Sequence, residues 1–190
     1  MTLLIALIAG AFGWTFTEYA MHHWNGHLSK GKLAFSREHL AHHRKFDYKS
    51  PLTTQIRVAL PILTVVFGGS FLLAGFASAV AFTAGLGGAD LGYGWLHETC
   101  HVAAPKTAFG RWARRHHFYH HFTSAKYNHG VTSPLWDIVF RTYRAPGLIR
   151  VPPRHVMPWL VDAEGKVKPE FAEHYELIVK RAPKKRAVAA

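Results

Sequence analysis

The feature that most restricts the fold of this sequence is an apolar stretch from about Arg57 to Trp95, in which residues 58–89 carry no charge. At a rise of 1.5 Å per residue, one helix of ~38 residues would be ~57 Å long, nearly twice the ~30 Å hydrocarbon core of a bilayer. Two crossings fit this length and one does not. We therefore expect a helical hairpin, with glycines 68, 69 and 75 as candidates for its turn or for close helix packing.

A second uncharged segment runs from Thr2 to Thr17, and the predicted first membrane helix extends to about Met21. No Lys or Arg precedes its apolar residues, which argues against a secretory signal. Basic residues gather instead in segments 30–57 and 106–126, so these segments are expected on the cytoplasmic side and the N-terminus outside. The sequence thus predicts an all-α membrane protein with about three transmembrane helices, one plus a hairpin, beneath a cytoplasmic histidine-rich helical cap.

The net charge of +12 does not indicate nucleic-acid binding. The basic residues flank apolar spans, where they suit anionic lipid headgroups, and no nucleic-acid motif accompanies them. Cys100 is the single cysteine of the chain, which excludes an intramolecular disulfide, thiolate metal cages and iron–sulfur clusters.

Twelve of the fifteen histidines lie between His22 and His121, and a His-x-x-His-His spacing occurs twice. Offsets of three and four share one helix face, so each triplet is expected to aim three imidazoles at one point. A lone histidine is usually a surface or hydrogen-bonded residue, but two identical triplets with two further pairs favour a metal site. Ten candidate ligands suit two metal ions: His22, His27, His39, His42, His43, His97, His101, His117, His120 and His121. The hairpin returns both triplets to one side of the membrane, where they can share these ions.

Two other classes of protein use histidines in membranes. His97-Glu98-Thr99-Cys100-His101 matches the His-Glu-x-x-His pattern of zinc proteases, in which the glutamate is a general base. Such a site needs three protein ligands, which would leave most of the histidines unexplained. A non-catalytic metal transporter would place histidines along the middle of its spans, whereas these lie at span ends and in basic loops.

The order of these motifs resembles the membrane fatty acid hydroxylase/sterol desaturase superfamily. The resemblance covers about residues 14–145 and includes the histidine boxes, Glu18-Tyr19 ahead of them, and Gly130–Asp137 followed by Phe140 after them. It implies a non-haem di-iron, O2-dependent enzyme acting on lipid, with the eight histidines of the boxes as ligands and His97 and His101 as an additional pair. His23 stands where the family often has Arg, and His116 leaves open which histidine leads the last box.

Further residues are expected to support the ligands. Glu18, Glu98, His116, His129 and Asp137 are candidates for groups that orient ligand imidazoles. His155 and His174 lie outside every box and are expected at the surface. Residues 1–145 form the predicted membrane-embedded domain. Residues 146–190 form a predicted C-terminal extension, with an irregular stretch at Ala145–Pro158, one helix at Glu170–Lys180 and a basic tail at Arg181–Ala190.

The expected activity is hydroxylation of a lipid C–H bond with O2, most closely on a fatty acyl chain. A carotenoid or sterol hydroxylase or desaturase would use the same chemistry. Imidazole binds Fe, Cu, Ni and Zn. Iron is the expected metal, because zinc is not redox-active, although the same ligands could also hold zinc. The substrate would enter from the bilayer, and electrons would come from a separate carrier protein of the ferredoxin or cytochrome type.

Overall fold

The computed structural model describes residues 2–45 and 47–178. The chain begins with helix α1 (Thr2–Ala20), which continues without a break as the π-helix η1 (Met21–Leu28). Three α-helices follow: α2 (Ala34–Arg44), α3 (Leu52–Val102) and α4 (Ala108–Phe122). A short helix α5 (Leu135–Val139) precedes strand β1 (Ile149–Val151), the 3-10 helices η2 (Pro153–His155) and η3 (Pro169–Phe171), and strand β2 (Tyr175–Leu177).

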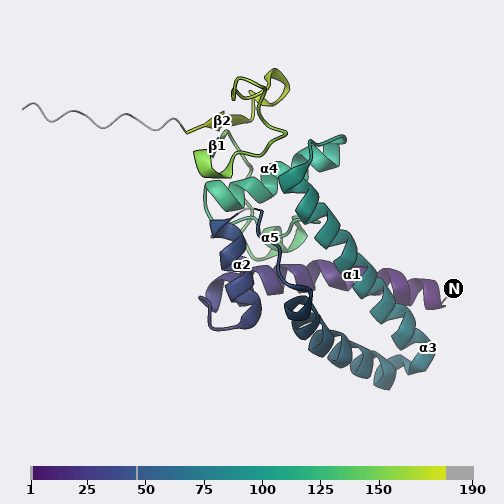
Figure 1. Ribbon diagram of the computed structural model, residues 1–190. Coiled ribbons are helices and arrows are strands. Elements are labelled where there is room, and N and C mark those ends of the chain that lie inside the picture. The colour runs from purple at the N-terminus through teal and green to yellow at the C-terminus, as the bar shows by residue number, and fades with distance from the viewer. Residues whose placement is uncertain (1, 46, 179–190) are drawn as a thin grey trace, which may run out of the picture.

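The predicted hairpin is α3, which is folded into two arms at Gly75. Gly75 has φ 77° and ψ 173°, a conformation that glycine adopts because it has no Cβ. The arms lie at one end of the molecule with α1, and α4 and the two strands lie at the other end (Figure 1). Pro61 is accommodated inside the first arm. Among the three candidate glycines, the turn is therefore at Gly75.

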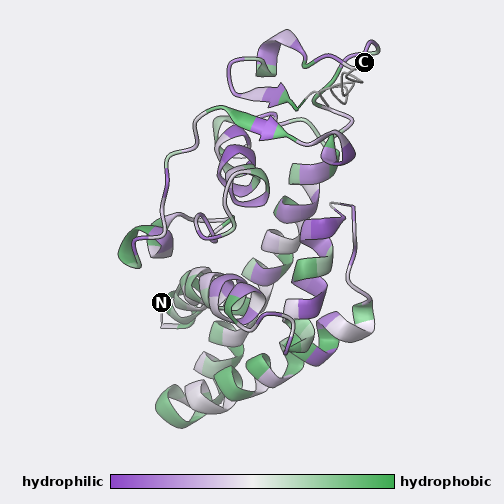
Figure 2. Cartoon of the chain, turned by 90° about the vertical axis from the view of Figure 1, so that its left-hand side faces the viewer, coloured by the Kyte–Doolittle hydropathy of each residue, from purple (hydrophilic) through white to green (hydrophobic). Residues whose placement is uncertain are grey.

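Two helices are long and apolar enough to cross a membrane, Thr2–Leu28 and Leu52–Val102. Their apolar side chains face outward, and Leu73 beside the hairpin turn is 90% exposed. Hydrophobic residues gather at the end of the molecule that holds α1 and α3, and hydrophilic residues at the other (Figure 2). Exposed apolar surface of this extent suits lipid rather than water.

Helix α1 and the second arm of α3 touch backbone to backbone at two glycines. A Cβ on Gly10 would lie 1.9 Å from the carbonyl oxygen of Phe82, and a Cβ on Gly85 would lie 2.0 Å from that of Leu7. Small residues permit such close crossings of membrane helices. This contact fixes how α1 and the second arm of α3 lie relative to each other, and so where the histidines at the ends of both helices are placed.

The C-terminal segment differs from its prediction. The stretch Ala145–Pro158 is partly regular, because β1 pairs in parallel with β2, with Ile149 opposite Tyr175. The helix predicted at Glu170–Lys180 is wrong over the described residues, where the chain forms η3 and β2 instead. Burial overrides helix propensity here, since Tyr175 packs in the core with Phe118 of α4 and Trp159. The tail Arg181–Ala190 lies outside the described residues.

The helix predicted around Phe109–Thr123 is confirmed as α4. Its first turn is capped by Thr107, whose Oγ1 accepts a hydrogen bond from the Gly110 N–H at 3.0 Å. The helix predicted for the first apolar segment is present as α1, and it extends seven residues beyond Met21, through η1 to Leu28.

The glycine crossing generates a prediction with a matched control. Gly85→Ala should destabilise the protein by about 1–3 kcal/mol, because the new methyl group collides with a backbone carbonyl. Gly88→Ala, three residues along the same arm, meets nothing within 4 Å and should stabilise the helix by up to about 1 kcal/mol. Thermal unfolding of both variants in lipid nanodiscs, followed by circular dichroism, measures the difference. Equal melting temperatures would show that the crossing is not close-packed.

Candidate metal centre

The ten predicted ligands gather in two groups of five. The first cluster consists of His22, His27, His39, His43 and His120, and the second cluster consists of His42, His97, His101, His117 and His121. Within each cluster, one ligand nitrogen from every residue lies within 4.8 Å of all the others. All ten side chains are buried or half-buried. The spatial arrangement thus brings together every residue of the predicted set.

Each His-x-x-His-His triplet is divided between the two clusters, contrary to the expectation that its three rings meet at one point. On α2, His39 and His43 belong to the first cluster and His42 to the second. Helix α4 has the opposite division, with His120 in the first cluster and the other two in the second. Residues four apart share a helix face more closely than the residue beside them, so a helix lying between two sites supplies a pair to one and a single ring to the other.

His22 and His27 face the same cluster because they lie on a π-helix. Residues five apart point in different directions on an α-helix, but the i→i+5 hydrogen bonding of a π-helix places them one above the other. Their rings are stacked with centroids 5.4 Å apart. The His-x4-His spacing is the sequence signal for this segment, but it predicts a π-helix only once both residues are known to share a site.

Two backbone carbonyls determine which nitrogens of the first cluster are free to bind a metal. Nδ1 of His120 donates to the carbonyl of Tyr127 at 2.7 Å, and Nδ1 of His22 donates to that of His129 at 2.5 Å. In a neutral ring, the other nitrogen then carries a lone pair and no proton. The Nε2 atoms of His22 and His120 are 2.9 Å apart. Two lone pairs facing each other at this distance cannot form a hydrogen bond, and a cation between them satisfies both.

The nitrogen separations in the first cluster also fit one ion. Neighbouring Nε2 atoms around the cluster are 2.8–3.1 Å apart. Ligand nitrogens that each lie ~2.0–2.1 Å from one ion at right angles to one another would be about 3 Å apart. In the second cluster, His101 and His117 have Nε2 atoms 2.9 Å apart. Nε2 of His42 and of His121 are buried without a hydrogen-bond partner among the residues the structure describes. Both clusters therefore fit a metal ion.

The rings on α2 and α4 are held in the neutral form that binds metal. Burial, followed by the charges of neighbouring histidines, lowers the pKa of His43 to about 3. Burial lowers the pKa of His42 to about 4, and that of His39 well below its usual value. The same cause lowers the pKa of His117, His120 and His121 well below 6.5.

Asp137 organises the loop that carries the carbonyls. Its carboxylate accepts hydrogen bonds from the backbone N–H groups of His129 and Gly130 at 2.9 and 2.8 Å, and from Nε2 of His116 at 3.2 Å. Burial raises the pKa of Asp137, but these hydrogen bonds outweigh it and the net pKa is lowered. Asp137 thus contacts no ligand ring of the ten directly, and positions the backbone that orients His22. His116 is buried and turned toward Asp137, so His117 is the residue of the last box that lies in a cluster.

Glu18 joins α1 to the same loop. Its carboxylate accepts hydrogen bonds from the backbone N–H of Val131 and from both the N–H and the hydroxyl of Thr132. Gly130 is required between these contacts, since a Cβ there would lie 2.1 Å from the carbonyl oxygen of Ser133. Glu18 therefore links α1 to the loop that contains Val131 and Thr132.

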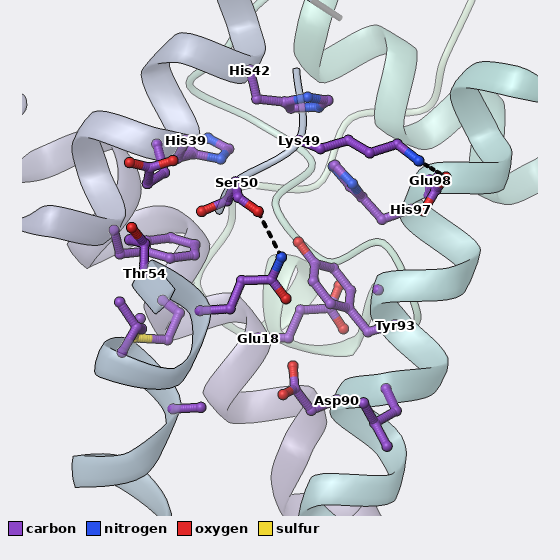
Figure 3. Close-up of a pocket in the computed structure, with 18 of the residues that line it drawn as sticks. Glu18, His39, His42, Lys49, Ser50, Thr54, Asp90, Tyr93, His97 and Glu98 are labelled. Atoms are coloured by element: carbon purple, nitrogen blue, oxygen red, sulfur yellow. Dashed lines mark hydrogen bonds and ion pairs between the residues drawn. The ribbon is translucent and has the colours of Figure 1, made fainter. Parts of the chain in front are cut away.

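Glu98 lies outside both clusters although it sits between two of their members. Its side chain is half exposed and pairs with Lys49, as Figure 3 shows at the edge of the site. The glutamate of the His-Glu-x-x-His motif thus points away from the metal positions. It ties the loop before α3 to the second arm of the hairpin.

The remaining histidines have individual surroundings. Nδ1 of His23 lies 3.0 Å from Nε2 of His129, which places His23 behind the first cluster. His155 is buried, not at the surface as predicted, and its Nε2 bonds to the carbonyl of Arg44 at 3.1 Å. The sequence offered no signal for His155, because its burial depends on the fold of the C-terminal segment. His174 is partly exposed, beside Arg115.

A cavity of about 680 Å³ adjoins both clusters. Its walls come from α1, α2, the loop 47–50 and both arms of α3, and Figure 3 shows His39, His42 and His97 at one end with Asp90 toward the other. Away from the histidines the lining is mainly apolar, with Ile62, Leu63 and Leu86. The shape and chemistry suit an elongated apolar molecule whose one part reaches the metal positions.

Asp137→Asn should weaken metal binding by about 10- to 100-fold, the usual effect of losing a group that positions a metal ligand. An amide at this position turns its NH2 toward backbone N–H donors, and the loop that orients His22 moves. Metal content after dialysis against a chelator, measured by mass spectrometry, tests this. Asp162→Asn is the control, because the side chain of Asp162 accepts a hydrogen bond from the Lys166 N–H in a surface turn. Equal metal retention by the two variants would contradict the role given to Asp137.

Known proteins are similar to this chain in sequence and in fold. Ceramide very long chain fatty acid hydroxylase SCS7 of Saccharomyces cerevisiae is 30% identical over 72% of this chain and 37% of its own length. Dihydroceramide fatty acyl 2-hydroxylase FAH1 of Arabidopsis thaliana is 32% identical over 72% of this chain and 59% of its own. The chain thus spans less than two thirds of the length of these relatives.

A solved structure described as full-length scs7p, with only the hydroxylase domain visible, is similar with a TM-score of 0.65 and 28% identity. The similarity covers 77% of this chain and 58% of that one. Residues 7–142, which hold both clusters and the Asp137 loop, match the family model described as fatty acid hydroxylase. The chain belongs to the fatty acid hydroxylase family.

Proposed function

We propose that this chain is an integral-membrane, O2-dependent lipid hydroxylase that holds two iron ions in its two histidine clusters. The observation that carries this proposal is the pair of Nε2 lone pairs, on His22 and His120, that face each other at 2.9 Å. Five imidazole nitrogens per cluster, with no carboxylate among them, form a donor set that iron accepts. Zinc binds the same donors, but the reaction requires a redox-active metal.

The reaction inserts one oxygen atom into a C–H bond and releases the other as water, and it consumes two electrons and two protons. When bound, the two metal ions supply the reductive activation of O2 that an unactivated C–H bond requires. The protein holds the ligand rings neutral, excludes bulk water by burying them, and positions the lipid in the adjoining cavity. The electrons come from a separate carrier protein of the ferredoxin or cytochrome type.

The proposed substrate is a fatty acyl chain of a membrane lipid. Two relatives are named for hydroxylation of ceramide or dihydroceramide fatty acyl chains. The apolar cavity is bounded by the two arms of α3, so a lipid can enter it sideways from the bilayer. Carotenoids and sterols are the alternative substrates, and the products of the reaction distinguish them.

The proposed topology has three crossings, by α1 and the two arms of α3, with the histidine cap in the cytoplasm. Each arm of α3 has more than 20 residues, so its length matches a ~30 Å hydrocarbon core. The basic residues of segments 30–57 and 106–126 support this orientation. Residues 1–145 would form the membrane-embedded domain and residues 146–190 the C-terminal extension, whose described part packs against α4.

Lipid profiles of a host that expresses the protein test the proposed function. The wild type should produce lipids that have gained one oxygen atom, and purified protein should hold two irons. His120→Ala and His42→Ala, one from each cluster, should each abolish the product and lower the iron content. A product that has instead lost two hydrogens would indicate desaturation and overturn the assignment as a hydroxylase.

Glu98→Gln separates this proposal from a zinc protease. An exposed ion pair contributes at most about 1 kcal/mol, so the variant should retain hydroxylation within about fivefold of the wild type. A His-Glu-x-x-His protease would lose all activity. Protein that holds one zinc and cleaves peptides, with cleavage abolished by Glu98→Gln, would exclude the hydroxylase.

A further inference from the structure

Asp90 is a carboxyl group in the apolar part of the cavity. It directly follows the uncharged run of residues 58–89, and it lines the cavity beside Leu86 and Leu91. Glu18 also lines the cavity, but its two oxygens are engaged by the N–H groups of the 131–132 loop and the Thr132 hydroxyl. Unlike Glu18, Asp90 has carboxyl oxygens that no described residue of the protein engages.

Within the described part of the chain, Asp90 forms no hydrogen bond and no ion pair, although its side chain is partly buried. A polar group in apolar surroundings costs free energy unless it finds a partner. Ionisable residues in membrane helices commonly mark the path of a substrate or ion for this reason. The partner of Asp90 is thus to be sought in the molecule that fills the cavity.

Asp90 shares a helix face with two residues of the second cluster. His97 and His101 follow it by seven and eleven residues, which are about two and three turns of the same arm of α3. Figure 3 shows Asp90 on this arm below Tyr93 and His97. At 1.5 Å per residue, Asp90 lies ~10 Å along the helix from His97, on the side of the cavity away from the cap.

We propose that Asp90 accepts a hydrogen bond from the lipid and so determines which carbon reaches the metal positions. A carboxyl oxygen accepts a hydrogen bond whether or not the group is protonated, so a hydroxyl or amide N–H of the substrate can donate to it in either state. The substrate class is an acyl lipid whose hydroxyl or amide N–H lies at a fixed separation from the carbon that is oxidised, on the scale of the ~10 Å rise between Asp90 and His97. Asp90 is a positioning residue and takes no part in the transfer of oxygen or electrons. This inference rests on the proposed function.

The test uses acyl lipids in which one hydroxyl is moved stepwise along the chain. With the wild type, the site of oxidation should move with the hydroxyl and keep a constant separation from it. Asp90→Leu should raise KM by about tenfold or more, the effect of losing one buried hydrogen bond, and should scatter the oxidised positions. Asp90→Asn retains an acceptor oxygen and should keep the separation.

A second measurement does not depend on activity. The same hydroxylated lipids, added without an electron donor, should raise the melting temperature of the wild type and of Asp90→Asn in nanodiscs, but not that of Asp90→Leu. Oxidation at unchanged positions and unchanged lipid-induced stabilisation in Asp90→Leu would overturn this inference and leave the hydroxylase proposal intact. A wild type that oxidises no lipid would instead overturn the proposed function, and the melting temperatures would still report whether Asp90 binds the hydroxyl.

Discussion

The structure depends on ten neutral imidazole rings whose nitrogens converge on two points. Such rings repel one another when their lone pairs meet, so the surrounding protein must hold them in place. It does so with rigid elements: four helices carry the ligands, and carbonyls of the 127–129 loop fix the tautomers of His22 and His120. The carboxylates of Asp137 and Glu18 hold that loop in place through hydrogen bonds to its backbone N–H groups. The close contact of α1 and α3 at their glycines sets the position of the helices.

The fold of the membrane part could be predicted from the sequence because each feature has a strong local signal. The length of the uncharged run predicts a hairpin, and the bend of α3 at Gly75 confirms it. The histidines of both triplets then meet in the two clusters. The C-terminal segment could not be predicted in this way. Its strand Tyr175–Leu177 has helix-compatible residues, and only packing against α4, which is distant in sequence, decides its form.

The composition of the candidate site was predictable, but its division was not. Spacing identifies which histidines share a helix face, yet it does not show that α2 and α4 lie between two sites and serve both. The π-helix at Met21–Leu28 could not be predicted either, because its geometry becomes evident only once His22 and His27 are known to face the same cluster. Glu98 shows the reverse case, in which a familiar motif suggested a role that the direction of the side chain does not support.

The division of each triplet has a consequence for both sites. His42 and His43 are adjacent on α2, and His120 and His121 are adjacent on α4, yet the members of each pair belong to different clusters. Under the proposed function, an ion in either cluster would be held by rings from both α2 and α4, so a change in the position of one helix would alter both sites. The same adjacency makes the spacing between the two clusters a property of helix geometry, insensitive to changes in the loops.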